Sequence, residues 1–334
     1  MNATRLSALI PGANRPSSSR PNAPRPSSTR PSSTRRTGLL LALGTACISG
    51  VAVFLNSYGV KAFGDASTYT TAKNVVAALV LVLLTGAISA RRPGTVLTRP
   101  SRPRQWAGLA IVGVFGGAVA FLLFFEGLAR ASSTDAAFLH KTLLVWVALL
   151  ALPLLGERLG AMHVAAIVLL VVGQIGLAGG VTTILGQGQL MVLAATLVWA
   201  AEVVVAKRLL ADLSSWTVGL TRMGVGSVVL IAWTLIRGQG SALTAMTGEQ
   251  WMWVLLTGLI LAGYVSTWFA ALSRAPAVDV TAVLVVGAVI TALLAALVKG
   301  SPLVPQLGWV ALVLAGAALA ALPGRGRNAL AGAT

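Results

Sequence analysis

Charged residues are scarce in this sequence, and acidic residues are the scarcest of them. Lys, Arg, Asp and Glu together make up 10% of the 334 residues, and 56% of the residues are apolar. Because a soluble domain carries roughly 25% charged residues, this composition excludes a water-soluble globular protein. The chain has one cysteine, Cys47, and two histidines. An intrachain disulfide is therefore excluded, and we expect no metal site and no cofactor.

The few charges present are mostly basic, and their positions matter more than their number. The formal net charge is +17, but seven of the 25 Lys and Arg residues lie in the first 36 positions. Most of the others lie in short gaps between apolar runs, which leaves no continuous basic face for a phosphate backbone to follow. We therefore expect these charges to meet a lipid bilayer and not a nucleic acid.

Residues 1–37 differ in composition from the rest of the chain. Arginine recurs at every fifth position from Arg15 to Arg35, with proline, serine and threonine between. Such a segment cannot bury enough apolar surface to become ordered, which predicts a disordered cytoplasmic tail, either docked on anionic headgroups or simply solvated. The apolar stretch at 6–10 is too short for a secretory signal. Residues 323–334 are expected to form a second cytoplasmic tail.

After Thr37 the chain consists almost entirely of apolar segments of membrane-spanning length. A helix needs about 20 apolar residues to cross the hydrocarbon core. Breaks rich in glycine, proline and charge separate ten such segments. The predicted spans are 38–58, 68–90, 105–127, 133–152, 161–179, 189–206, 214–236, 250–271, 277–298 and 303–322. We therefore predict an all-α integral membrane protein with ten transmembrane helices.

The distribution of Lys and Arg between the gaps predicts the orientation of these helices. If the N-terminus is cytoplasmic, 18 basic residues lie on the cytoplasmic side, four lie outside and three lie within spans. Because basic residues favour the cytoplasmic side, we expect a multi-pass protein of the cytoplasmic membrane with both termini in the cytoplasm.

The chain also repeats itself. Residues 127–135 (GLARASSTD) align without gaps on residues 271–279 (ALSRAPAVD), and a second match places Asn56 opposite Glu202. This predicts two five-helix repeats, 38–180 and 188–322. Because five is odd, the second repeat enters the membrane from the opposite side. Inverted repeats are a recurring plan of secondary transporters, which bind substrate near the midplane between the repeats.

Several stretches carry a family resemblance. They are the aromatic-rich helix 3 that runs into Gly127-Leu128, the stretch 136–139 (AAFL), the turn 155–159 (LGERL) and, in the second repeat, 268–272 (WFAAL). With these stretches, residues 38–322 resemble the EamA-type branch of the drug/metabolite transporter superfamily, ten-helix bacterial permeases. Two stretches depart from the family pattern. Residues 140–144 lack the proline that often interrupts helix 4, and the second repeat lacks the acidic turn at 300–302. The resemblance implies transport of a small organic solute, such as an amino acid, a related metabolite or a drug.

Charges within the predicted spans are the first candidates for a transport site, because each costs at least about 2.5–3.5 kcal/mol near a helix centre. In the first repeat, Lys73, Glu126 and Lys141 fall in the outer half of the membrane, with His140 beside Lys141. We expect Lys141 to pair with Glu126. The pair would serve either as a substrate contact or outer gate, or as a static structural contact.

The second repeat offers a matching arrangement near the cytoplasmic side. Glu202 and Arg222 are expected to form an ion pair, either an inner gate or a structural contact, and Asn56 is a further candidate because it lies opposite Glu202. Proton-coupled export would follow if Glu126 or Glu202 titrates between the two access states.

Aromatic and helix-start residues complete the set of candidates. Three tryptophans lie deep enough to line a cavity, with core packing as the alternative: Trp146, Trp199 and Trp268. Asp135 and Asp279 begin predicted helices, where a carboxylate stabilises the first turn. Glu157 and Arg158 lie in the turn after the fourth span, where we expect a conformational or assembly role.

The alternatives to a transporter are an integral-membrane enzyme and a membrane scaffold or sensor. The sequence holds no His-Glu-x-x-His and no Gly-x-Ser-x-Gly motif, and neither alternative explains a doubled fold. We therefore predict a permease and not an enzyme, working by alternating access as a monomer or homodimer, with a small-molecule solute as its partner.

Overall fold

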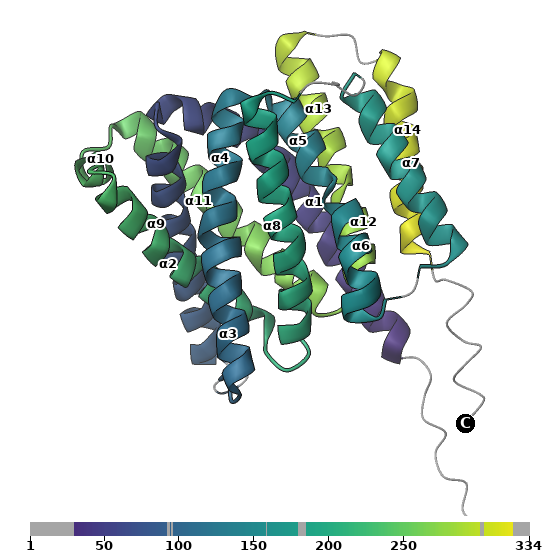
Figure 1. Ribbon diagram of the computed structural model, residues 1–334, viewed down its shortest axis with the longest axis horizontal. Coiled ribbons are helices and arrows are strands. Elements are labelled where there is room, and N and C mark those ends of the chain that lie inside the picture. Colours follow the sequence, from purple (N-terminus) through teal and green to yellow (C-terminus); the bar gives the residue numbers. More distant parts are fainter. Residues whose placement is uncertain are drawn as a thin grey trace, which may run out of the picture.

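The computed structural model describes residues 30–91, 94, 96–157, 159–179, 185–300 and 304–322, and every regular element in these residues is a helix (Figure 1). The predictions for residues 1–29, for Arg158 and for 323–334 lie outside the described residues.

The first half of the chain forms five helical segments. They are α1 (Arg30–Phe63); α2 (Ala66–Arg91); a third built from α3 (Pro103–Ile111), the π-helix η1 (Val112–Val119) and α4 (Ala120–Arg130); a fourth built from α5 (Ser133–Lys141) and α6 (Leu143–Leu155); and α7 (Ala161–Leu177). Each coincides with one predicted apolar segment.

The second half follows the same plan. Its segments are α8 (Gln187–Leu209); α9 (Ser215–Ile236), followed by the short α10 (Gly240–Thr244); α11 (Gly248–Leu272); α12 (Ala277–Leu284) with α13 (Val286–Lys299); and α14 (Leu307–Ala321), which the 3-10 turn η2 (Val304–Gln306) precedes.

Eight of these segments, 22 to 31 residues long, are long and apolar enough to cross a membrane. The other two, α7 and α14, have 17 and 15 residues. At 1.5 Å per residue they reach about 23–26 Å, short of the roughly 30 Å hydrocarbon core. They pack against each other at one side of the bundle (Figure 1), where Gly176 lies directly under the Trp309 ring.

Helix α1 begins earlier than its composition suggests. It starts at Arg30, so the prediction of a disordered tail is wrong for residues 30–37. The Arg35 guanidinium explains the difference. It donates to the Asp279 carboxylate at 2.8 Å and to the backbone carbonyls of Ala320 and Ala321. These contacts anchor the first turns of α1 to helices far along the chain.

The two halves share local details at the predicted offset of 144 residues. Both α6 and α13 end at a glycine with φ near 65°, Gly156 and Gly300. Arg130 and Arg274 each donate to the carbonyl oxygen four residues earlier. A one-residue break also separates α5 from α6, at Thr142, and α12 from α13, at Val285, one residue short of this offset. The sequence repeat is therefore a structural repeat.

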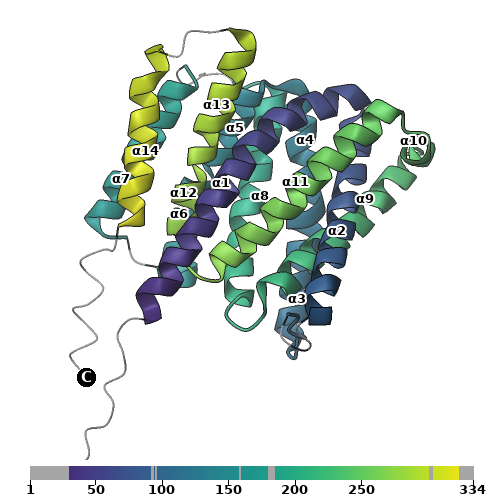
Figure 2. The ribbon, with the colours of Figure 1, turned by 180° about the vertical axis from the view of Figure 1, so that it is seen from behind.

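The first helices of the two repeats run in opposite directions. Arg35, near the start of α1, contacts Asp279 at the start of α12. Lys207, near the end of α8, donates to the Ala275 carbonyl oxygen just before the same helix. The start of α1 and the end of α8 therefore lie at one end of the bundle. Figure 2 shows α1 beside α11 on the face opposite that of Figure 1.

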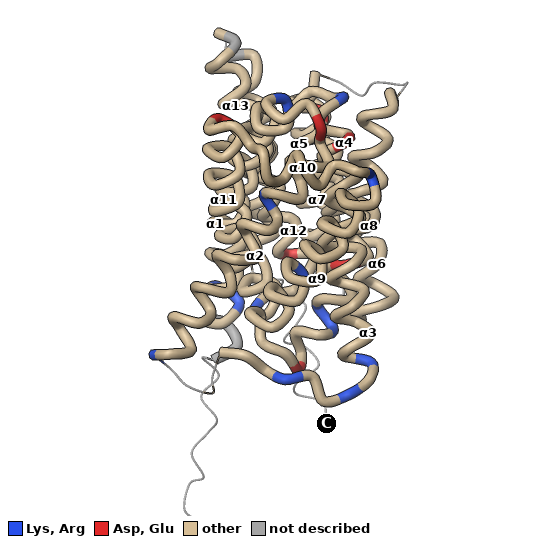
Figure 3. The backbone as a smooth tube through the Cα atoms, turned by 90° about the vertical axis from the view of Figure 1, so that its left-hand side faces the viewer, with Lys and Arg blue, Asp and Glu red and all other residues tan. Residues whose placement is uncertain are grey.

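Lys and Arg lie mainly toward the two ends of the bundle, and few charges lie in its middle (Figure 3). Of the charges that the sequence places within spans, Lys73, Lys141, Glu202 and Arg222 are each at most 4% exposed. They mark the place where a site would be found.

Candidate functional site

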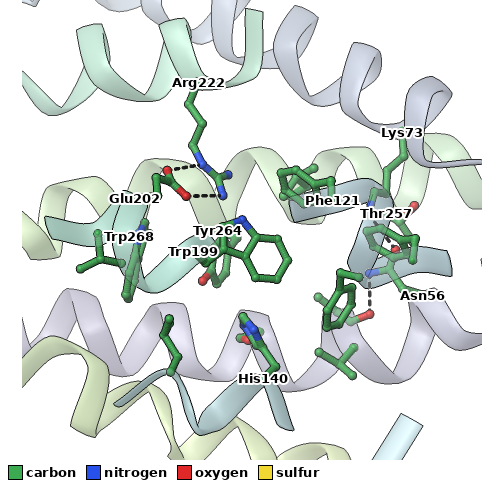
Figure 4. A pocket seen from close by; sticks show the side chains of 18 residues that line it. Asn56, Lys73, Phe121, His140, Trp199, Glu202, Arg222, Thr257, Tyr264 and Trp268 are labelled. Carbon is green, nitrogen blue, oxygen red and sulfur yellow. Dashed lines mark hydrogen bonds and ion pairs between the residues drawn. The ribbon is translucent and has the colours of Figure 1, made fainter. Parts of the chain in front are cut away.

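A cavity lies in the middle of the bundle, between the two repeats (Figure 4). Its empty volume is about 690 Å³, including space open to the exterior. Helices α1, α2, α4, α5 and α6 line it from the first repeat, and α8, α9 and α11 from the second. Seven residues predicted from the sequence line it: Asn56, Lys73, His140, Trp199, Glu202, Arg222 and Trp268.

The predicted ion pair between Glu202 and Arg222 is confirmed. Arg222 Nε donates to Glu202 Oε1 at 2.6 Å, and Nη2 donates to Oε2 at 3.2 Å. Both side chains are 4% exposed. Because the contact is bidentate and both carboxylate oxygens take part, each charge is compensated within the protein.

Glycines of η1 make room for this ion pair. A Cβ atom at Gly116 would lie 2.2 Å from the Glu202 carboxyl carbon, and one at Gly117 would lie 2.0 Å from the Arg222 carbonyl oxygen. The Gly116 carbonyl oxygen accepts a hydrogen bond from Trp199 Nε1 at 3.1 Å. The glycines of η1 thus let α8 and α9 pack closely against η1 beside the cavity. Short π-helical segments are frequent at functional sites.

A second polar group lies on the other side of the cavity. Lys73, 1% exposed, donates to Asn56 Oδ1 at 3.2 Å, and its ammonium lies 3.4 Å from the centre of the Phe125 ring. The Tyr69 hydroxyl donates to the same Asn56 oxygen and lies 3.0 Å from Thr257 Oγ1. Figure 4 shows Lys73, Asn56 and Thr257 apart from the Glu202–Arg222 pair.

Aromatic rings fill the space between the two polar groups. Phe121 lies near both cations, with Arg222 Cζ 4.9 Å and Lys73 Nζ 5.5 Å from its ring centre. The rings of His140 and Trp199 are in edge contact at 5.0 Å. Sequence reasoning missed Phe121, although aromatic residues at 121, 124 and 125 occupy one face of a helix and could have indicated it.

Comparison with known proteins agrees with this architecture. The model of the EamA-like transporter family matches residues 36–179 and again residues 186–322, one match for each repeat. The chain belongs to the EamA-like transporter family. This family match is consistent with the drug/metabolite transporter superfamily that the sequence resembles. Members of the EamA family are membrane transporters and not enzymes.

Solved structures support the fold of this EamA protein. In all, 29 solved chains match it. One of them, described only as the crystal structure of a protein, superposes with a TM-score of 0.62 at 20% sequence identity. The alignment covers 86% of the EamA protein and 95% of the solved chain. Among curated proteins, none matches the sequence.

The expected pairing of Lys141 with Glu126 is wrong. Lys141 Nζ donates to Ser49 Oγ of α1 at 2.6 Å, whereas Glu126 contacts Arg130 one turn later on its own helix and Arg237 at 3.9 Å. The two side chains leave α4 and α5 in different directions. Neither side chain is among the lining of the central cavity.

Trp146 is also placed outside the lining of the central cavity. It is half-buried, and its indole nitrogen donates to Thr142 Oγ1 at the break between α5 and α6. The ring also packs against the hydrophobic core, and core packing is the alternative to cavity lining that the sequence left open.

Glu157 and Asp279 lie at the end of the bundle where α1 begins. Glu157 accepts hydrogen bonds from the backbone amides of Ala277 and Val278, the first two residues of α12. Asp279, in the same helical turn, binds Arg35 and lies 3.3 Å from His163 Nε2. Glu157, and not Asp279, therefore caps α12, and both carboxylates join the first repeat to the second.

Asp135 lies in the first turn of α5, as the sequence predicts. Its backbone amide donates to Ser132 Oγ at 3.0 Å, so Ser132 caps the helix. The Asp135 carboxylate adds a negative charge at the positive end of the helix dipole.

Proposed function

We propose that this EamA protein is a permease that moves a small organic solute across the cytoplasmic membrane by alternating access. The observation that carries the proposal is the position of the cavity. It is lined by both repeats, and it holds buried ionisable side chains in the middle of an apolar helix bundle. Intramembrane ionisable residues of this kind mark solute pathways.

In this proposal the chain crosses the membrane ten times, with α7 and α14 as the two short spans and both termini in the cytoplasm. The opposite directions of α1 and α8 support an inverted arrangement of the repeats. A helix shorter than the hydrocarbon core is accommodated by local thinning of the bilayer at modest cost.

The contacts at the end where α1 begins support a closed gate on that side. Arg35–Asp279, His163–Asp279 and the capping of α12 by Glu157 all join the first repeat to the second. Opening the cavity toward this end would require the two repeats to separate there. Alternating access by the rocking of one repeat against the other would make and break these contacts.

Counterflow in proteoliposomes tests the proposal. Purified protein is reconstituted, the vesicles are loaded with one member of a panel of amino acids and metabolites, and uptake of the labelled solute is measured. Ala52→Phe places a ring in the cavity and should abolish counterflow, whereas Ala87→Phe, on an exposed face of α2, should leave it unchanged. A protein without transport activity would move no solute, which would refute the proposal.

The same vesicles test proton coupling. If uptake against a gradient collapses on addition of a protonophore, the protein is a proton-coupled carrier. If the solute only equilibrates across the membrane, with or without the protonophore, it is a facilitator.

A further inference from the structure

The two repeats place a similar pair of side chains into the cavity, but only one of the pairs is electrically neutral. In each pair a cation from the second helix of the repeat meets an acceptor from the first helix. In the second repeat the acceptor is the Glu202 carboxylate, which neutralises Arg222. In the first repeat it is the Asn56 amide oxygen, which accepts from Lys73 but carries no charge.

Lys73 is therefore a buried amine without a carboxylate partner. No carboxylate of the described residues lies within ion-pair distance of it, although the side chain is 1% exposed. The Phe125 ring attracts the ammonium through its π-face but brings no opposite charge. An ammonium has three hydrogen-bond donors, and Asn56 satisfies one of them. A buried ammonium is stable when an opposite charge lies beside it, so a bound anion would supply the partner that the described residues do not.

The same lining offers no free anion to a cationic ligand. Among the described lining residues, Glu202 is the one carboxylate, and Arg222 engages both of its oxygens. The ammonium of a bound amine or amino acid would find no unpaired carboxylate here. It would also be repelled by Lys73.

The rest of the lining is aromatic and suits a flat apolar group. Phe121, Phe124 and Trp199 form one wall, and the Trp199 ring centre lies 5.4 Å from each of the two phenylalanine ring centres. On α11, the rings of Tyr264 and Trp268 stack with their centres 6.1 Å apart. His140 Nδ1 is buried in this wall without a hydrogen-bond partner among the described residues. Such rings bind apolar ligand surface while a few polar groups fix its orientation.

We propose that the cavity binds a small organic monoanion with an apolar, flat body, and that its carboxylate pairs with Lys73. The body of the anion lies against the aromatic wall. Binding of this anion does not depend on the proposed function. Only its role as the transported solute rests on that function. It selects carboxylates that lack an amino group over zwitterionic amino acids and over amines.

Equilibrium binding to the purified full chain in lipid nanodiscs tests the proposal. Four probes share one ring and differ in charge: 3-phenylpropionate, its neutral amide, zwitterionic phenylalanine and cationic 3-phenylpropylamine. Binding is used in place of flux, because the protonated acid crosses bilayers without a carrier. We expect 3-phenylpropionate to bind at least ~10-fold more tightly than each of the others, the effect of a charge-assisted hydrogen bond.

Variants assign this preference to one residue. Lys73→Met should bring the acid and the amide to equal affinity, whereas Lys61→Met, an exposed lysine on α1, should keep the preference. Where Lys73→Met does not yield folded protein, the wild-type series decides alone. The proposal is overturned if phenylalanine or the amine binds as tightly as the acid, if none of the probes binds, or if Lys73→Met keeps the preference.

These results are separable from those that test transport. A wild-type protein that shows counterflow of some solute but no preference for the anion refutes this inference and leaves the proposed function standing. Binding that depends on Lys73 without any counterflow refutes the proposed function alone.

Discussion

Breaking the Glu202–Arg222 pair on one side should be among the most damaging small changes in this EamA protein. Glu202→Gln keeps the shape of the side chain but leaves the Arg222 charge buried at 4% exposure with no counterion. Removing one partner of a buried ion pair costs about 3–5 kcal/mol, because the remaining charge has lost both water and its partner. By the soluble-domain scale of 2–4 °C per kcal/mol, this corresponds to a fall of roughly 6–20 °C in the melting temperature.

The double variant separates the ion pair from the size of its side chains. Arg222→Met removes the cation, and in Glu202→Gln/Arg222→Met no charge is left buried. The double variant should therefore be more stable than the sum of the two single changes predicts, by about 2 kcal/mol or more. Glu126→Gln is the matched control, because its partner Arg130 is 44% exposed and such a pair contributes about 0–1 kcal/mol.

Thermal unfolding in detergent, followed by intrinsic fluorescence and by size-exclusion chromatography, measures these differences. The reasoning is refuted if Glu202→Gln lowers the melting temperature no more than Glu126→Gln does. Additive effects of the two single changes, within about 0.5 kcal/mol, would equally show that the two charges are not coupled.

Three further predictions use the same unfolding assay. Gly117→Ala should destabilise the protein by about 1–3 kcal/mol or more, because its Cβ atom would meet the Arg222 carbonyl oxygen at 2.0 Å, whereas Gly44→Ala meets nothing within 4 Å and should not destabilise it. Arg35→Gln should cost about 2–3 kcal/mol through the lost charged hydrogen bonds, and a melting temperature equal to that of wild type would contradict the anchoring of α1. Partial burial raises the pKa of Asp65, but hydrogen bonds from Thr68 and Gln239 and the charge of Arg237 together hold it below its ordinary value. Asp65 therefore stabilises the fold above the ordinary carboxyl pKa, and this stability is lost as the pH falls through the lowered value. Asp65→Asn should remove that part of the acid sensitivity, and an unchanged acid profile would refute the assignment.

The helix positions could be predicted from the sequence because the chain is an alternation of long apolar runs and short polar breaks. The start of α1 could not, because the partners of Arg35 are Asp279 and the backbone carbonyls at the end of α14, more than 240 residues away. The π-helical form of η1 could not be predicted from the sequence either. The sequence shows the glycines of η1, but it does not show that α8 and α9 pack so closely against η1 that glycine is required.

The sequence could predict those parts of the site in which a buried charge needs an opposite charge beside it. Glu202 and Arg222 pair as expected, because each would otherwise be an isolated charge in an apolar protein. Lys141 does not pair with Glu126, because depth along a helix gives no information on which face turns inward. In helices that are apolar on all sides, periodicity cannot supply that information. The structure supplies it by directing Lys141 to Ser49.

Cysteine accessibility tests the central claim, a transport cavity that opens in turn to each side, most directly. The chain has one cysteine, Cys47, so Cys47→Ala gives a cysteine-free background in one step. Ala52→Cys then places a single thiol in the cavity lining. In oriented membranes, an impermeant thiol reagent added from either side should label this residue, and bound solute should slow the labelling. Labelling from one side alone, whatever solute is present, or from neither side, would contradict the account.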